Sequence, residues 1–167
     1  MAGLPGRAKT GAPEVMVDLF SLLPIFGGDF AGAGVDAMGA PLRVALTLEP
    51  MLAGRLWQAR LRGERELVGG SVEEVVLFTV DARGKTLALA GSLDHPGLQS
   101  HPLVEARVDA DEGACFTFGD LGSGPFSTQF RLAFHPGGAL SWGWRHQRPE
   151  GEARESQLRL ERCLEEA

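Results

Sequence analysis

Short β-favouring runs, broken by glycine, proline or aspartate about every ten residues, make up the chain after residues 27–28. This spacing leaves no room for long helices and is typical of strands joined by tight turns. The 23 glycines of the 167-residue chain can supply many such turns. The pattern predicts about ten strands, at residues 29–38, 42–50, 54–62, 72–81, 85–93, 103–109, 113–119, 126–135, 139–147 and 153–163.

Alternation of apolar and polar residues supports strands over helices. Residues 43–49 and 126–134 both follow a two-residue period, as a strand with one buried face requires. The turn-forming segments 81–84, 111–113 and 135–138 lie between such runs at hairpin spacing. Successive strands should therefore pair with each other in antiparallel order.

About ten strands cannot remain a flat sheet with open edges, because unpaired edge groups promote aggregation. Closure into a barrel removes the edges, and sequential hairpins favour an up-and-down barrel over a sandwich. The sequence thus predicts an all-β protein with a closed antiparallel barrel. Its size fits one domain, which we place at residues 13–167.

The N-terminal part of the chain differs from the rest. Residues 1–12 lack any period, so we expect a disordered leader. Apolar residues then recur at helical spacing from Pro13, and Pro24 should end the run, which predicts a short helix at 13–23. This helix would cap one mouth of the barrel, either as a plug that completes the core or as a mobile lid.

Charge and cysteine usage narrow the possible partners. The net charge of -6 gives no basic field for a phosphate backbone, so we expect no nucleic-acid partner. No apolar stretch is long enough for a membrane span, and the first residues do not resemble a signal peptide. We therefore expect a cytoplasmic protein. Cys115 and Cys163 lie in no metal-ligand or CxxC spacing and should be free thiols.

Residues 28–34, with the sequence Gly-Asp-Phe-Ala-Gly-Ala-Gly, resemble the G-x-W-x-G-x-G opening strand of calycin (lipocalin-like) barrels, with Phe30 in place of tryptophan. The aromatic ring would plug the closed end, and the glycines would let neighbouring backbone come close. The structural motif of the resemblance consists of Gly28, Phe30, Gly32, Gly34 and Arg162.

A second segment, residues 48–57, resembles the "E…L-G-R-x-W/L" turn of bacterial barrels of the DUF1579 type, which are similar to nitrobindins and fatty-acid-binding proteins. In calycins an arginine of the last strand commonly covers the opening aromatic. Arg159 or Arg162 would then stack on Phe30 through a cation–π contact. The alternative is that the last-strand arginines form a solvated face paired with nearby glutamates.

The resemblance to nitrobindins raises the question of haem, which those proteins bind through a histidine of the last strand. Gln157 stands about where that histidine would be, and an amide is a poor axial ligand. We therefore expect no haem and no other cofactor. Histidines 95, 101 and 135 precede proline and fit turns, and no metal-ligand spacing is present.

Two residues remain as candidates for acid–base chemistry. His146 shares a strand face with two tryptophans and would lie near a cavity mouth if that face points inward, although a solvated strand end is the simpler interpretation. Glu49 ends an alternating strand on its polar face, at a position where the resemblance repeatedly places a glutamate. The other carboxylate clusters, including Glu73-Glu74, fit turns and strand starts that serve solubility.

Aromatic residues on the apolar faces of the later strands usually form core, yet small barrels commonly hold one ligand. We predict binding of a small hydrophobic or amphipathic molecule in the barrel. The alternatives are an enzyme acting on a hydrophobic metabolite in the same cavity and an interaction domain with a filled barrel. A dry apolar cavity favours carriage, and a buried titratable group favours catalysis. The candidate ligand-binding residues are Phe116, Phe118, Thr128, Phe130, Trp142, Trp144 and His146.

Overall fold

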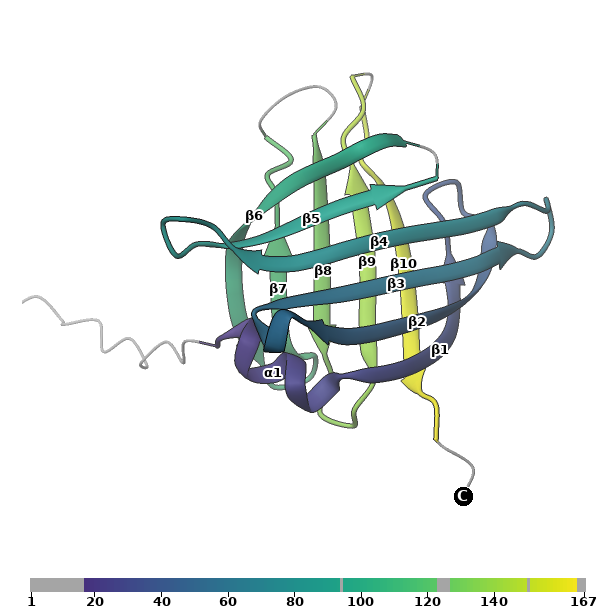
Figure 1. Ribbon diagram of the computed structural model, residues 1–167. Coiled ribbons are helices and arrows are strands. Elements are labelled where there is room, and N and C mark those ends of the chain that lie inside the picture. Colours follow the sequence, from purple (N-terminus) through teal and green to yellow (C-terminus); the bar gives the residue numbers. More distant parts are fainter. Residues whose placement is uncertain (1–16, 94, 123–126, 150, 165–167) are drawn as a thin grey trace, which may run out of the picture.

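The computed structural model describes residues 17–93, 95–122, 127–149 and 151–164 and shows a closed antiparallel barrel with one short helix at one end (Figure 1). This confirms the all-β barrel predicted from the sequence. The helix α1 spans Leu19–Phe26. The strands are β1 Gly28–Val35, β2 Pro41–Met51, β3 Leu56–Arg65, β4 Ser71–Val80, β5 Thr86–Ser92, β6 His95–Asp109, β7 Gly113–Phe118, β8 Thr128–Phe134, β9 Leu140–His146 and β10 Arg154–Arg162.

Each strand pairs with its neighbours in sequence, and β1 closes the barrel by pairing with β10. Two glycines permit this closure. A Cβ atom on Gly32 would lie 1.9 Å from the carbonyl oxygen of Arg159, and one on Gly34 would lie 1.9 Å from that of Gln157. Neither position has room for a side chain, so the glycines of the opening strand let β10 come close, as the motif predicted.

The helix α1 covers one end of the barrel (Figure 1). Asp18 caps it by accepting a 3.1 Å hydrogen bond from the backbone N–H of Phe20, and Leu19 and Leu23 are buried in the core. The side chain of Phe26 packs on Phe134 of β8, with 4.5 Å between ring centroids. The helix end of the barrel is thereby closed.

The helix boundaries differ from the predicted 13–23. Residues 13–16 lie outside the described chain, Asp18 has extended backbone, and the helix continues through Pro24 to Phe26. A proline removes only one hydrogen bond in so short a helix, and most helical stability comes from packing. The apolar contacts with the barrel therefore outweigh the breaking tendency of Pro24.

An aromatic core lies inside the barrel and comes mainly from β4, β7, β8 and β9. Phe78, Phe118 and Phe130 form a mutual cluster with centroid distances of 5.8, 5.8 and 6.2 Å. Phe130 also contacts Trp142 and Trp144 at 4.6 and 4.9 Å. Side chains therefore fill this part of the interior.

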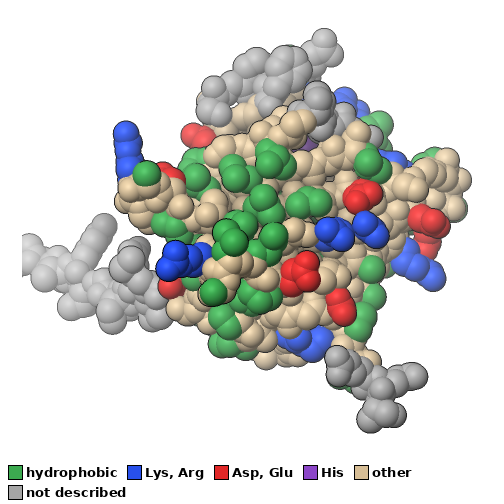
Figure 2. Space-filling view, in the orientation of Figure 1, with side chains coloured by type: hydrophobic (Ala, Val, Ile, Leu, Met, Phe, Trp, Pro, Cys, Tyr) green, Lys and Arg blue, Asp and Glu red, His purple; other side chains and the backbone are tan. Residues whose placement is uncertain are grey.

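The outer face carries charges of both signs, and Figure 2 shows them interspersed with apolar side chains over the strands that face the viewer. No single-sign field covers this face. Among the described residues, no helix has the length and apolar character that a membrane-spanning helix needs.

Candidate functional site

A cavity of about 920 Å³ opens into the barrel. Its lining includes residues 36–38 from the β1–β2 turn and residues 147–149 after β9, so the mouth lies at the end opposite α1. The side walls come from several strands and mix apolar and polar groups. They include Leu42, Leu61, Val72, Glu74, Ala90, Gln99, His101, Thr128, Trp142, Trp144, His146, Ser156 and Leu158.

Glu74 is an acidic side chain within the cavity wall. The indole N–H groups of Trp144 and Trp142 donate hydrogen bonds of 2.7 and 3.1 Å to its Oε1 atom. Strand β4 lies across the barrel from β9, so these bonds span the interior. Protein surrounds the carboxyl group, and Glu74 keeps partial exposure because it lines the cavity.

Burial strongly perturbs this carboxyl group. Removal from water raises the pKa of Glu74 to about 7, and this effect outweighs the two indole hydrogen bonds, which lower it. Near neutral pH the group therefore exists in both protonation states. It can accept hydrogen bonds or a cation as a carboxylate, and it can donate a proton as an acid.

His101 on β6 lies near the same tryptophan. Its side chain is 6% exposed, its ring centroid is 5.2 Å from that of Trp144, and its Nε2 atom has no hydrogen bond to any described residue. Burial lowers the pKa of His101, and the nearby His146 lowers it further, so His101 is neutral at physiological pH. His146 stacks on Trp144 with 6.3 Å between centroids. Trp144 thus lies against three titratable side chains, those of Glu74, His101 and His146.

The mouth carries an ion pair. Arg65 of β3 lies 2.9 Å from Asp36 of the β1–β2 turn. Burial acts to raise the pKa of Asp36, but hydrogen bonds from the Ala40 N–H, Arg65 and the Met38 N–H prevail and lower it. Asp36 is therefore a carboxylate at neutral pH and orders this edge of the entrance.

Four of the predicted ligand-binding residues line the cavity: Thr128, Trp142, Trp144 and His146. The other three, Phe116, Phe118 and Phe130, are fully buried in the aromatic core and do not line it. They point inward as expected, but neighbouring rings surround them. The difference arises because one end of the barrel is filled and the other is hollow.

Two sequence-based assignments need correction. Glu49 is exposed on the outer face of β2, because the inward positions of that strand are Leu42, Val44, Leu46 and Leu48. It does not line the cavity. Gln157 is exposed too, and its neighbours Ser156 and Leu158 line the cavity instead. Gln157 therefore does not occupy an inward position where a haem ligand would stand.

The opening-strand motif lies at the helix end. Phe30 is buried, and the guanidinium of Arg162 lies 5.0 Å from its ring centroid. The same guanidinium donates hydrogen bonds of 2.7 Å to the carbonyl of Gly27 and 3.1 Å to that of Ile25. Arg162, and not Arg159, makes the contact expected for a last-strand arginine, and it holds α1 to the barrel.

Sequence reasoning missed Glu74 and His101. The local sequence predicts a solvated strand start for Glu74, although Val72, Val76 and Phe78 alternate with it and mark its face as inward. Pro102, which follows His101, predicts a turn at that position. Strand β6 in fact begins at His95, before both residues, and shifts register between Leu103 and Glu105. A proline in a bulged strand is tolerated.

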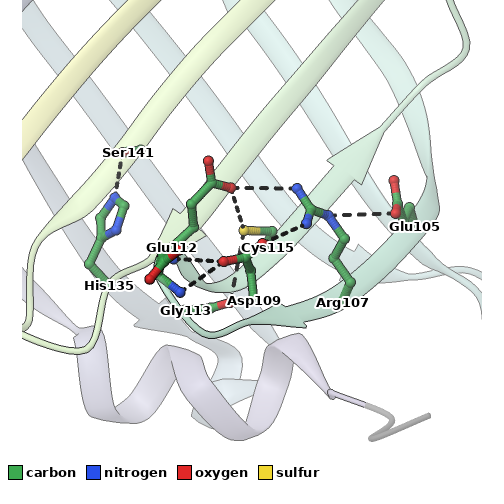
Figure 3. Close-up of polar contacts among 9 residues, drawn as sticks. Glu105, Arg107, Asp109, Glu112, Gly113, Cys115, His135 and Ser141 are labelled. Carbon is green, nitrogen blue, oxygen red and sulfur yellow. Dashed lines mark hydrogen bonds and ion pairs between the residues drawn. The ribbon is translucent and has the colours of Figure 1, made fainter. Parts of the chain in front are cut away.

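The outer surface holds a second polar cluster near the helix end (Figure 3). The Cys115 thiol lies 3.5 Å from Glu112 Oε2, and Arg107 forms ion pairs with Glu112 and Asp109. Burial and the adjacent Glu112 raise the pKa of Cys115. A protonated thiol is a poor nucleophile, so these contacts act against thiolate formation at Cys115. Cys115 and Cys163 are free thiols, as predicted.

No protein-family model matches the chain, and no curated protein matches it in sequence. The architecture is consistent with a calycin-like fold. Among the described residues, no group of three or more histidine, cysteine or acidic side chains is arranged to hold a metal ion.

Proposed function

We propose that the protein binds a small amphipathic molecule in the barrel cavity. The observation that carries this proposal is the combination of a 920 Å³ open cavity with a polar cluster in its wall, Glu74 held by two indoles. The volume suits one small organic ligand, and pockets of this kind pair apolar walls with a few convergent polar groups. The apolar part of the ligand would lie against Leu42, Leu61 and Leu158.

The resemblance to DUF1579-type, nitrobindin and fatty-acid-binding barrels supports the same proposal by analogy of fold. The opening-strand glycines and the Phe30–Arg162 contact are the residues that support it. A cytoplasmic location and the absence of a nucleic-acid partner also remain proposals.

Native mass spectrometry of freshly purified protein tests the proposal directly. We expect a small-molecule adduct that dissociates on denaturation, or uptake of a hydrophobic naphthalene fluorophore after the adduct is removed. Ala90→Phe places a ring in the cavity and should abolish both signals, because Ala90 lines the wall. Ala45→Phe is the matched control, because Ala45 is exposed on the outer face of β2. Absence of both adduct and uptake in the unmodified protein would refute ligand binding.

The second candidate is an enzyme that uses the same cavity, and the raised pKa of Glu74 favours it. A group that titrates near pH 7 can serve as general acid or base, and His101 Nε2, which has no hydrogen-bond partner among the described residues, lies in the same wall. The recovered ligand separates the two functions. A carrier returns it chemically unchanged after incubation, whereas an enzyme converts it, and Glu74→Gln should then stop conversion while binding persists.

A further inference from the structure

The cavity contains the carboxyl group of Glu74, which no cationic side chain of the described residues pairs with. Among the described residues, no arginine, lysine or histidine forms an ion pair with Glu74, and only the two indole N–H groups engage it. Both indoles bind the same oxygen, Oε1. The remaining oxygen, Oε2, accepts no hydrogen bond from the described residues and belongs to a side chain that lines the cavity. Its polar surface is thus available to a ligand.

Leaving such a charge without a partner is unfavourable. Burial of an ionised carboxylate costs several kcal/mol unless an opposite charge and hydrogen bonds compensate for it. The two indole hydrogen bonds compensate only in part, because burial still raises the pKa of Glu74 to about 7. A ligand that brings a positive charge to Oε2 would remove this penalty, whereas an anionic group there would increase it.

The other ionisable groups of the described cavity lining form no ion pair with Glu74. Burial keeps His101 uncharged at neutral pH, and Arg65 is paired with Asp36 at the mouth. Glu73 lies 3.5 Å from Arg62.

Glu74 is three residues from the start of β4 at the mouth end, about 10 Å along the strand. The remaining lining groups with ionisable side chains are Arg148 and Arg154, which belong to the mouth, and His146, which stacks on Trp144.

We propose that the cavity selects ligands with an organic ammonium group, and that the carboxylate of Glu74, oriented by the indoles of Trp142 and Trp144, is the counter-ion. This inference rests on the proposed ligand-binding function and specifies the chemistry of the ligand head group. The apolar part of the ligand occupies the leucine-lined walls, and the ammonium N–H groups donate to Oε2.

A matched ligand series tests the head group. Decylammonium, decanol and decanoate share one alkyl chain and differ only in charge, and calorimetry gives their affinities. At about pH 8 we expect decylammonium to bind about tenfold more tightly than decanol, and decanoate to bind most weakly. Equal affinities, or a preference for decanoate, would overturn the inference while leaving ligand binding intact. Failure of all three chains to bind would overturn both.

Two variants test whether Glu74 is the counter-ion of the ammonium group. Glu74→Gln keeps an oxygen acceptor for the indoles and should abolish the preference for decylammonium over decanol. Glu49→Gln changes the net charge by the same amount on the outer face and should keep that preference. If Glu74→Gln retains the preference, the counter-ion is not Glu74.

A pH series on the unmodified protein provides a test that does not depend on any variant. Because the ammonium group selects the carboxylate form, its affinity should rise several-fold between about pH 6 and about pH 8, with proton release at the lower pH. Decanol carries no charge, so its affinity over the same pH range measures changes in the cavity that do not involve the ammonium group. An affinity ratio that does not change with pH would contradict the role of Glu74.

Discussion

The indole N–H of Trp144 donates a 2.7 Å hydrogen bond to the carboxyl group of Glu74 across the hollow part of the barrel. The two residues lie on β9 and β4, which are not neighbours in the sheet, so the bond links opposite walls. It orients an acidic group toward a cavity instead of toward solvent. The expected pH dependence of stability and the proposed chemistry of the ligand head group both rest on this arrangement.

Glu74→Gln should stabilise the protein at alkaline pH. The folded-state pKa of about 7 lies above the ordinary glutamate pKa of 4.5, so the unfolded chain releases the Glu74 proton first as the pH rises. The stabilising effect of the protonated carboxyl group is therefore complete below about pH 4.5 and is lost by about pH 7. At pH 8 the variant should be more stable by about 3 kcal/mol, and near pH 4.5 it should equal the native protein.

Denaturant unfolding at several pH values measures this difference. Glu49→Gln is the control, because Glu49 is exposed on the outer face and should show no comparable pH-dependent gain. A constant difference between Glu74→Gln and native protein over this range would show that the pKa of Glu74 is not raised in the folded state.

The buried ring of Phe30 should contribute strongly to stability. Phe30→Ala removes a core aromatic and the surface that the Arg162 guanidinium covers, so we expect a loss of about 3–5 kcal/mol. Val35→Ala, at an exposed position of the same strand, should change the free energy of unfolding by less than about 0.5 kcal/mol. Equal thermal unfolding of the two variants would mean that the opening-strand motif has no structural role.

Closure between β1 and β10 should not tolerate a methyl group at Gly34. The Cβ of Gly34→Ala would lie 1.9 Å from the carbonyl oxygen of Gln157, so the two strands must separate. We expect a loss above about 2 kcal/mol. Gly137→Ala is a suitable control, because nothing lies within 4 Å of its Cβ position. Circular dichroism melts of both variants check the difference, and a near-native melting temperature for Gly34→Ala would contradict the close approach.

Much of this architecture could be predicted because strands and turns are local patterns. Alternation in residues 43–49 identified the inward face of β2, and Pro-Gly turns separated β8 from β9. The predicted helix boundaries differ from the observed ones because the helix begins after the Asp18 cap and its end depends on packing against the barrel. Helical periodicity gives information on neither.

The site was harder to predict, since it depends on which strands meet across the interior. Alternation correctly grouped Trp142, Trp144 and His146 on one face, and all three line the cavity. It did not reveal that Glu74, about 70 residues earlier in the chain, accepts hydrogen bonds from two of them. The shear and closure of the barrel bring the side chains of β4 and β9 together, and the sequence period does not determine shear or closure.

Haem binding needs a separate argument, because Gln157 faces outward and its amide does not occupy the position of an axial ligand. The chain has no tyrosine, and on the described lining of the cavity the imidazoles are those of His101 and His146. His101 is only 6% exposed, so it presents no open imidazole to a flat macrocycle, and His146 stacks on Trp144 with 6.3 Å between ring centroids. Glu74 would also place a charge in the same cavity.

We therefore expect haemin titration to give weak, non-saturable absorbance without a sharp Soret band. A histidine ligand must direct a ring nitrogen at the iron with space for the porphyrin on that side, and the nearly complete burial of His101 does not leave this space. A saturable one-to-one spectrum would contradict this expectation. Its loss in His146→Ala, but not in His135→Ala, would then identify His146 as the axial ligand, because His135 instead contacts Ser141 at 2.5 Å and does not line the cavity.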